Sequence, residues 1–408
     1  MTERATPNPK LQTKLSIPLD PAHPNGPTLV GILAHSNPLG ALFPPSTLRL
    51  QPAAREVDPG AVLDPALAVE GKIGVADEEG SSSSALGGSG SVEEGSVLGA
   101  RARPGPKPLA LILHGILAHK DQIYHKKLVA ALEMDSFRFD FRANHESPGE
   151  WSMSSFDEDV KEMRAVISHL RTFFNYRVHV LVAHSRGAID VWTYLGEQER
   201  LRRAAQAGGK TQLEDVDLDI PAYVVSLGSR WRMERIYDRI KIYEEGFRTE
   251  GFYRWKARVA GQDVEARITL AQVEEFCRYP IAAYVQDAPL ESDYLLVMGT
   301  ADKMVPTSDV GFYMNALTSR AGRRPGSVQM HLVEHADHNF VGHYDEVVET
   351  ILSWLRARQA EKEAGQHQGS SNGDEGRAAA DANVADLDLT GIPSRATATA
   401  GVAGSGKL

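Results

Sequence analysis

A five-residue turn built from small residues around a serine constrains the fold of this chain more than any other feature. The turn, residues 183–187 (AHSRG), stands between a strand-like apolar run at 178–182 and a helix-like apolar run at 188–195. Where a strand turns sharply into a helix, the positions two before and two after the central residue must be small, because the two elements approach closely. The alanine and glycine at the ends of the turn meet this requirement. The pattern therefore predicts an α/β fold with Ser185 at the tip of the turn.

A second strand-like run lies upstream, at residues 109–113 (LALIL), and is typical of a buried parallel strand. The loop 114–116 (HGI) follows it. If Ser185 is the nucleophile of an acyl transfer, the oxyanion of the tetrahedral intermediate needs two backbone N–H donors. One comes from the residue after the nucleophile and one from the loop after this early strand, which selects Arg186 and Ile116. We expect the histidine of the loop to position the loop and to take no part in the chemistry.

An acid and a histidine follow downstream. The strand-like run 294–298 leads into a glycine-containing loop that carries Asp302. Another strand-like run, 328–333, leads into the loop 334–340, which carries His338. An acid that leaves a strand into a glycine-containing loop is well placed to orient a histidine. The order Ser, Asp, His is the one expected when a triad is built on this type of sheet.

The three residues predict a catalytic triad with distinct roles. His338 would take the proton from Ser185 and later return it. Asp302 would fix the tautomer of the histidine and stabilise the imidazolium that forms. His335 is the alternative base, because it lies nearer to the end of the strand.

These motifs resemble the α/β-hydrolase superfamily, and within it the serine aminopeptidase-like branch that includes the cinnamoyl and feruloyl esterases. The resemblance covers most of residues 109–356. The motifs that carry it are His114-Gly115, Lys120-Asp121, Phe139-Asp140-Phe141-Arg142, Glu146-Ser147, the turn around Ser185, Gly299-Thr300-Ala301-Asp302 and Asp337-His338-Asn339-Phe340. Two positions depart from the pattern: Ala183 stands where glycine is commoner, and residues 143–145 (ANH) replace the usual Gly-x-Gly. The resemblance implies a mostly parallel central sheet flanked by helices.

The leading functional hypothesis is a carboxylic-ester hydrolase that works through an acyl-enzyme on Ser185, with water as second substrate and no cofactor. An aminopeptidase, an amidase or an acyltransferase would use the same triad, and the fold alone does not separate these classes. An aminopeptidase needs an acidic site for the amine of its substrate, for which the candidates are Glu244, Glu245 and Glu250. A third hypothesis, a non-catalytic binding protein with a hydrolase fold, is disfavoured by the complete triad.

The distribution of charge bears on the partners. The formal net charge of −10 arises in two stretches, since residues 51–100 carry nine acids and two bases and residues 361–408 carry seven acids and four bases. The rest of the chain has no net charge, and so the sequence does not predict a positively charged surface that would bind nucleic acid or an anionic membrane. No apolar run approaches the length of a membrane span. We expect a small-molecule ester as the partner, and the sequence does not predict the oligomeric state.

Two further features favour a cytoplasmic protein. Residues 1–10 are polar and lack the apolar core of a secretory signal. Cys277 is the only cysteine, so no intrachain disulfide can form, as is usual in a reducing compartment.

The chain is predicted to hold one α/β domain with an insertion and a tail. Residues 11–50 contain two apolar runs that predict an N-terminal hairpin of this domain. Residues 51–107 are rich in serine, glycine and acidic pairs, and we predict a disordered low-complexity insertion because they have too little apolar periodicity to bury a core. Residues 108–360 are the hydrolase domain, and residues 361–408 are a predicted disordered tail.

The α/β alternation breaks at about 233–290, where we predict a cap over the active site. Two alternating runs meet at a turn that contains Gly261 and predict a hairpin. Its aromatic residues Phe252, Tyr253 and Trp255 are candidates for lining an apolar acyl or aryl pocket. The alternative is that they only anchor the hairpin to the body of the domain.

Three other motifs resemble functional sites but lack residues that those sites require. Residues 34–38 (AHSNP) resemble the turn around Ser185, with Ser36 at the centre, but lack the glycine that ends that turn. Residues 401–408 echo a phosphate-binding loop, but leucine stands where serine or threonine is required. Four clustered histidines raise the possibility of a metal site, yet no accompanying pattern of carboxylates supports it, and we predict no metal. They are His331, His335, His338 and His343.

Overall fold

The structure is a computed structural model that describes residues 10–36 except 21 and 24, the backbone of 55–57, and residues 105–207 and 220–375, with the backbone alone beyond 364. The chain divides into two compact units, Met1–Arg356 and Ala357–Leu408, and each is described by itself. The second unit is described only where it continues the last helix, α10 (Tyr344–Glu375).

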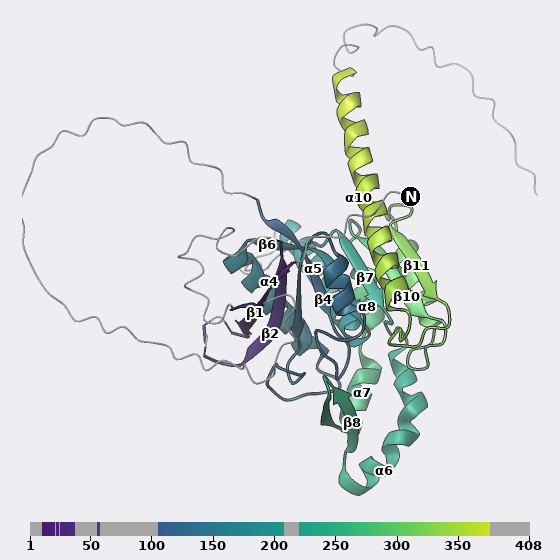
Figure 1. Cartoon of the computed structure of the whole chain (residues 1–408). Helices are drawn as coiled ribbons and strands as arrows, with labels where there is room; N and C mark the ends of the chain where they lie inside the picture. The colour runs from purple at the N-terminus through teal and green to yellow at the C-terminus, as the bar shows by residue number, and fades with distance from the viewer. Residues whose placement is uncertain are drawn as a thin grey trace, which may run out of the picture. The chain divides into compact units, whose positions relative to one another are not determined.

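Nine described strands form one sheet in the order β11-β10-β7-β6-β4-β5-β2-β1-β3 (Figure 1). The six from β11 to β5 pair in parallel, and β2, β1 and β3 complete the sheet with antiparallel pairs. Their bounds are β1 (Leu11–Pro18), β2 (Thr28–His35), β3 (Arg55–Val57), β4 (Lys107–Leu113), β5 (Asp135–Asp140), β6 (Tyr176–His184), β7 (Tyr223–Leu227), β10 (Asp293–Gly299) and β11 (Val328–Val333). The predicted mostly parallel sheet and N-terminal hairpin are present.

Helices cover both faces of the sheet. Alternate residues of β4 point into two separate apolar cores, since Leu109, Leu111 and Leu113 belong to one core and Ala110 and Ile112 to the other. The larger core is closed by α4 (Phe156–Phe174), α5 (Arg186–Gln206), α8 (Ile281–Asp287) and α9 (Asp309–Thr318). The smaller core is closed by α3 (His125–Ala131) and the first turns of α10. A strand buried on both faces must be apolar, which is why β4 shows no polar alternation from Leu109 to Leu113.

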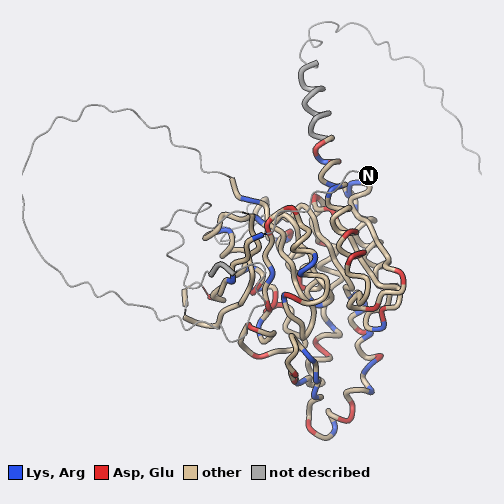
Figure 2. Tube along the Cα trace, viewed as in Figure 1, with Lys and Arg blue, Asp and Glu red and all other residues tan. Residues whose placement is uncertain are grey.

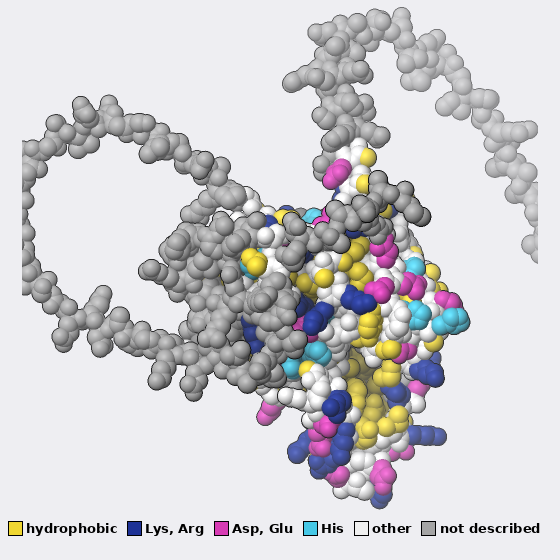
Figure 3. Space-filling model, in the orientation of Figure 1, with side chains coloured by type: hydrophobic (Ala, Val, Ile, Leu, Met, Phe, Trp, Pro, Cys, Tyr) yellow, Lys and Arg dark blue, Asp and Glu magenta, His cyan; other side chains and the backbone are white. Residues whose placement is uncertain are grey.

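The cap lies between β7 and β10 and contains η1 (Met233–Arg239), α6 (Ile240–Glu250), β8 (Tyr253–Val259), β9 (Gln262–Ile268) and α7 (Leu270–Arg278). The strands β8 and β9 form the predicted hairpin, and the φ angles of Ala260 (49°) and Gly261 (81°) are positive at both central positions of its turn, as a tight two-residue turn requires. Figure 2 shows acidic and basic residues mixed along the backbone of the cap. In Figure 3, apolar side chains gather where the cap joins the body.

The predicted insertion and tail lie mostly outside the described residues. Within the insertion, β3 pairs with β1, a pairing that the prediction of disorder did not include because three residues are too few to show a period. The helix α10 continues to Glu375 and so passes the predicted domain boundary at residue 360. Alanine, glutamine and glutamate after 357 favour a helix even without an apolar stripe. None of the described helices combines the length and apolarity of a membrane span.

Candidate active site

Ser185 stands at the sharp turn between β6 and α5. Its backbone has φ 54° and ψ −115°, a conformation that costs a non-glycine residue about 1–3 kcal/mol and persists only where the surroundings hold it. The N–H of Ser185 donates to the carbonyl of Leu227 at 2.8 Å. A side chain at Gly187 would place its Cβ 2.5 Å from the carbonyl oxygen of His114. Close approach of β4 to the start of α5 therefore requires the glycine that the sequence pattern singled out.

Three predicted residues form one chain of hydrogen bonds. Nε2 of His338 lies 2.8 Å from Oγ of Ser185, and Nδ1 of His338 lies 2.7 Å from Oδ2 of Asp302. The other carboxylate oxygen, Oδ1, accepts from the amides of Met304 (2.7 Å) and Val305 (2.8 Å). Burial alone would raise the pKa of Asp302, but the hydrogen bond from His338 and these two amides lower it below its ordinary value. The carboxylate is thus held in its charged form against the histidine.

The three side chains converge because their loops leave neighbouring strands at the same edge of the sheet. Ser185 follows β6, Asp302 follows β10 and His338 follows β11. A Cβ at Gly299, the last residue of β10, would lie 2.3 Å from the carbonyl of Ala336, so the acid and histidine loops pack directly on each other. His335, the alternative base, points elsewhere: its side chain is 86% exposed and its Nδ1 lies 3.7 Å from its neighbour Glu334.

Two buried histidines support this arrangement. Nε2 of His184 bonds the carbonyl oxygen of His338 at 2.9 Å, and the two rings lie 5.0 Å apart. Nδ1 of His114 bonds the carbonyl of Gly115, while its Nε2 accepts from the amide of Phe141. Burial lowers the pKa of His184 to about 3 and that of His114 to about 4, so both rings are neutral near pH 7. The sequence analysis missed His184, because a position inside the turn that tolerates many residues carries no signal.

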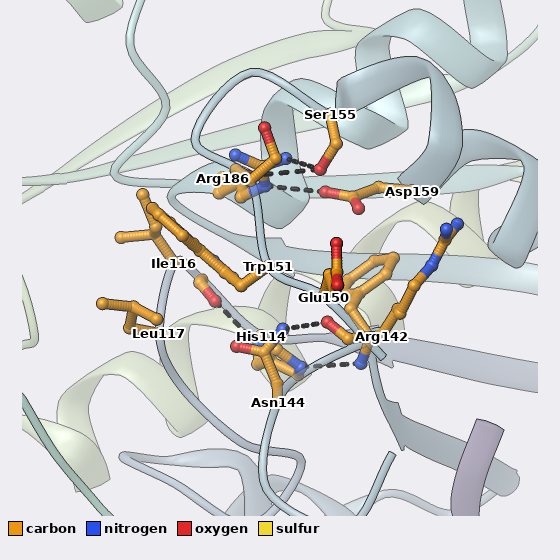
Figure 4. A pocket seen from close by; sticks show the side chains of 13 residues that line it. His114, Ile116, Leu117, Arg142, Asn144, Glu150, Trp151, Ser155, Asp159 and Arg186 are labelled. Atoms are coloured by element: carbon orange, nitrogen blue, oxygen red, sulfur yellow. Dashed lines mark hydrogen bonds and ion pairs between the residues drawn. The ribbon is translucent and has the colours of Figure 1, made fainter. Parts of the chain in front are cut away.

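The predicted oxyanion residues border one pocket beside the turn (Figure 4). Arg186 is the first residue of α5, where a backbone N–H has no acceptor within the helix. Ile116 lines the same pocket, which has about 380 Å³ of empty space, partly open to solvent. The Arg186 side chain is anchored: Nε donates to Asp159 at 2.6 Å, and the guanidinium lies 4.5 Å from the centre of the Phe156 ring. This anchoring holds the backbone that carries the amide.

The cap hairpin contributes to a second pocket through residues that the sequence analysis did not select. Val259, Val264 and Ala266 line it, together with the loop residue Asn144 and Trp151, which also border the first pocket.

The predicted aromatic residues of the cap line neither of these two pockets. Phe252 lies between the guanidiniums of Arg254 and Arg267, whose centres are 5.0 and 4.8 Å from its ring centre. Tyr253 packs on Tyr243, with ring centres 4.9 Å apart. Trp255 meets Trp151 edge to face at 6.2 Å and so touches a wall of both pockets. That these residues bind substrate stays a prediction.

The acidic candidates for an amine site also lie away from the two pockets. Glu244, Glu245 and Glu250 belong to α6, and Glu250 forms an ion pair with Arg254 at 2.6 Å. None of the three lines either pocket.

One group of potential metal ligands occurs among the described residues, formed by Asp140, His145 and Glu146. The Lys120 ammonium forms ion pairs with both carboxylates, and its side chain is 1% exposed. A cation of the protein itself therefore neutralises this group. Within the described residues, the four clustered histidines are not brought together as metal ligands.

The family of the chain follows from a sequence comparison that agrees with this fold. The model of the alpha/beta hydrolase family matches residues 110–350. The match spans more than half of the chain, from within β4 to beyond β11, so the chain belongs to the α/β hydrolase family.

Individual relatives are distant. The uncharacterized protein YDL057W of Saccharomyces cerevisiae is 23% identical over 252 residues, which are 57% of this chain and 69% of that protein. Est1E of Butyrivibrio proteoclasticus, solved with ferulic acid bound, is 14% identical, with a TM-score of 0.44 over 64% of this chain and 92% of that one. A monoacylglycerol lipase of Paleococcus ferrophilus is 17% identical, with a TM-score of 0.42 over 62% of this chain and 96% of that one.

Proposed function

We propose that this protein is a serine hydrolase that cleaves carboxylic esters through an acyl-enzyme on Ser185. The observation that carries the proposal is the continuous hydrogen-bond chain from Ser185 through His338 to Asp302. A serine hydroxyl is a weak nucleophile unless a base takes its proton, and a base at 2.8 Å that is itself oriented by a carboxylate meets this need.

The reaction has two halves. Oγ of Ser185 attacks the ester carbonyl carbon while Nε2 of His338 accepts the hydroxyl proton, and the charge of Asp302 stabilises the imidazolium. The amides of Ile116 and Arg186 donate to the oxyanion. His338 then gives its proton to the departing alkoxide, which leaves as an alcohol. Water, deprotonated by His338, attacks the acyl-enzyme, and the acid leaves with Ser185 restored.

The glutamates that the sequence offered as an amine site do not support the aminopeptidase alternative. Recognition of a free ammonium needs a carboxylate that faces the bound substrate. The three glutamates of α6 that were candidates for this role line neither pocket near the triad, and one of them is paired with Arg254.

The proposal is tested by covalent labelling and by hydrolysis of a short p-nitrophenyl ester. We expect the wild-type protein to react with a fluorophosphonate and to hydrolyse the ester, and Ser185→Ala to do neither while its melting temperature changes little. Ser36→Ala is the matched control, because Ser36 stands in a similar sequence motif but its Oγ donates to Asp135 at 3.0 Å. Persistent labelling of Ser185→Ala would show that the nucleophile lies elsewhere.

A further inference from the structure

Arg230 differs from the other buried arginines of the described residues, because no carboxylate pairs with it. Four arginines are at most 8% exposed. The other three form ion pairs, which are Arg138–Asp121, Arg186–Asp159 and Arg358–Glu361. A buried charge has lost its hydration and is normally paired with an opposite charge. Burial accordingly lowers the pKa of Arg230 below its ordinary value, although a guanidinium stays charged in a protein.

The Arg230 guanidinium has donors to spare. Its Nη2 donates to the carbonyl of Met304. Its Nε and Nη1 donate to no described residue, and neither belongs to the fully buried polar atoms that lack a partner. The backbone that carries the side chain is fixed, since the hydroxyl of Tyr313 donates to the carbonyl of Arg230 at 2.8 Å. A ligand can therefore reach two free donors on a rigid support.

A second guanidinium lies beside the first. Arg239, at the end of η1, is half-buried and forms no ion pair with a described residue. Its Nη1 contacts the sulfur of Met304 at 2.9 Å, so both guanidiniums touch the same residue. The charge of Arg239 further lowers the pKa of Arg230. Two like charges that are held together repel each other, and a bound anion relieves this repulsion.

The carboxylates near Arg230 are engaged by other groups. Three of them act on its charge, and their partners are Arg232 for Asp309, Arg235 for Asp238 and His338 for Asp302. Arg230, Arg239 and these two further arginines carry four positive charges against three negative ones, so one positive charge is left while His338 is neutral. A single carboxylate balances this surplus, whereas an ammonium adds to it.

The loop after β7 places Arg230 next to the triad. In the sheet, β7 lies between β6, which leads to Ser185, and β10. The carbonyl of Leu227, the last residue of β7, accepts from the N–H of Ser185 at 2.8 Å. A Cβ at Gly228 would lie 3.2 Å from Cε1 of His338, the ring atom next to the nitrogen that bonds Ser185. Arg230 is two residues further on, so its Cα is within about 7 Å of that of Gly228.

The acid loop connects both guanidiniums to the triad from the other side. The amide of Met304 donates to Oδ1 of Asp302 at 2.7 Å, while its carbonyl and its sulfur contact Arg230 and Arg239. One residue thus separates the two cations from the carboxylate that orients the catalytic base. Both arginines also lie where the chain passes from the sheet into the cap.

We infer that the natural substrate is an ester whose acyl or alcohol part carries a carboxylate, and that Arg230 and Arg239 bind this carboxylate. The inference rests on the proposed function, because it concerns the group that extends from an ester held at Ser185. The two arginines are specificity-determining residues in this account and take no part in the proton transfers.

The experiment uses the full chain and two pairs of esters, each pair differing by one terminal carboxylate. Ethyl hexanoate and monoethyl adipate differ on the acyl side, and hexyl acetate and 6-acetoxyhexanoate differ on the alcohol side. Rates are followed by titration of the released acid and divided by the rates of alkaline hydrolysis. We expect wild-type kcat/KM to favour the carboxylate member of one pair by about 10- to 100-fold, as for hydrogen bonds between charged groups.

Variants separate recognition from folding. Arg230→Met and Arg239→Met keep an unbranched side chain and remove the charge, so each should lower the ratio between carboxylate and plain ester by about tenfold. Arg239 is the less buried of the two, so Arg239→Met serves the comparison if Arg230→Met does not fold. Arg278→Met is the matched control, because the Arg278 side chain is 69% exposed at the end of α7, and it should keep the wild-type ratio.

The outcomes distinguish the two proposals. A wild-type protein that is labelled at Ser185 yet prefers neither carboxylate ester overturns the inference and leaves the proposed function standing. An unchanged ratio in both Arg230→Met and Arg239→Met also overturns it, as does an equal loss in Arg278→Met, which would assign the preference to the overall charge of the cap. Preference for ethyl 6-aminohexanoate over monoethyl adipate overturns it in favour of an ammonium. A wild-type protein that is neither labelled nor active on any ester overturns both.

Discussion

The two sides of the candidate site are built in different ways. On the side of the triad, every side chain sits one to five residues beyond the end of a parallel strand, and Gly115 and Gly228 lie beside Ser185 and His338. On the side of the pockets, the walls come from the loop after β4, from the loop after β5, which includes Trp151, and from the cap hairpin. The comparison teaches that the rigid sheet positions the chemistry, while the loops and the inserted cap shape what is bound.

The largest effect should come from the carboxylate of the triad. Asp302→Asn would present an amide N–H to Nδ1 of His338 and favour the wrong tautomer, so we expect kcat to fall by about 10⁴, as the same change does in serine proteases with this triad. The measurement is kcat for a short p-nitrophenyl ester. His335→Ala is the control and should keep near-normal rates, because its side chain is exposed and far from this carboxylate. Near-normal turnover in Asp302→Asn would mean that the triad's acid has been misassigned.

Adding a methyl group at the turn should lower both stability and activity, because the turn has no space for it. Gly187→Ala would force a Cβ to 2.5 Å from the His114 carbonyl, and we expect a loss of about 1–3 kcal/mol in the free energy of unfolding together with reduced activity. Gly311→Ala, in α9, meets no atom within 4 Å and should instead stabilise the protein by up to about 1 kcal/mol, as alanine replaces glycine in a helix. Chemical denaturation of both variants checks the prediction, and equal effects of the two changes would contradict it.

The buried histidines of the triad side should make stability depend on pH. The pKa values of His184 (about 3) and His114 (about 4) lie below their ordinary value of 6.5, so the unfolded chain binds more protons between pH 6.5 and about 4. The free energy of unfolding is therefore highest, as far as these two groups are concerned, above pH 6.5 and falls as the pH is lowered through this window. Each histidine lowers it by up to about 1.4 kcal/mol per pH unit. Denaturation at several pH values should show this slope, and His184→Gln should reduce it. An unchanged slope in that variant would show that His184 is not buried in its neutral form.

The smallest effect concerns the cap. Trp255 contacts Trp151, which lines both pockets, so Trp255→Ala should lower kcat/KM for an aryl ester more than for an acetyl ester, by about 1 kcal/mol for one aromatic pair. Phe252→Ala is the control, since Phe252 lies between two arginines and should affect both esters alike. If Trp255→Ala lowers kcat/KM equally for both esters, the hairpin has only a structural role.

Much of the triad side could be predicted from the sequence. The small residues around Ser185 and the apolar run before Asp302 are local signals, because a parallel strand buried on both faces is apolar along its length and its loop begins where the apolar run ends. The strand before His338 lies at the sheet edge and is half exposed, and the order of the three residues was the further guide. The α/β hydrolase fold was predicted from the resemblance of these motifs to that superfamily. The hairpin of the cap was also predicted, since its alternation and its glycine turn are local properties.

The resemblance of Asp337-His338-Asn339-Phe340 already favoured His338 over His335. The tertiary structure placed His338, and not His335, against Asp302, and it brought His184 beside His338. Two histidines three residues apart in a loop look alike in sequence, and which of them faces the carboxylate depends on the packing of one loop on another at Gly299.

The pocket side was decided by tertiary structure almost entirely. Trp151 and Asn144 lie before α4 in a segment without periodicity, so no sequence pattern marked them as pocket residues. Of the hairpin residues, Val259, Val264 and Ala266 line the second pocket and the three cap aromatics do not, because of how the hairpin packs on the loop after β5. Such contacts join segments more than a hundred residues apart. A local pattern determines the elements and their buried faces, whereas the walls of a pocket depend on which exposed edges meet after those faces have packed.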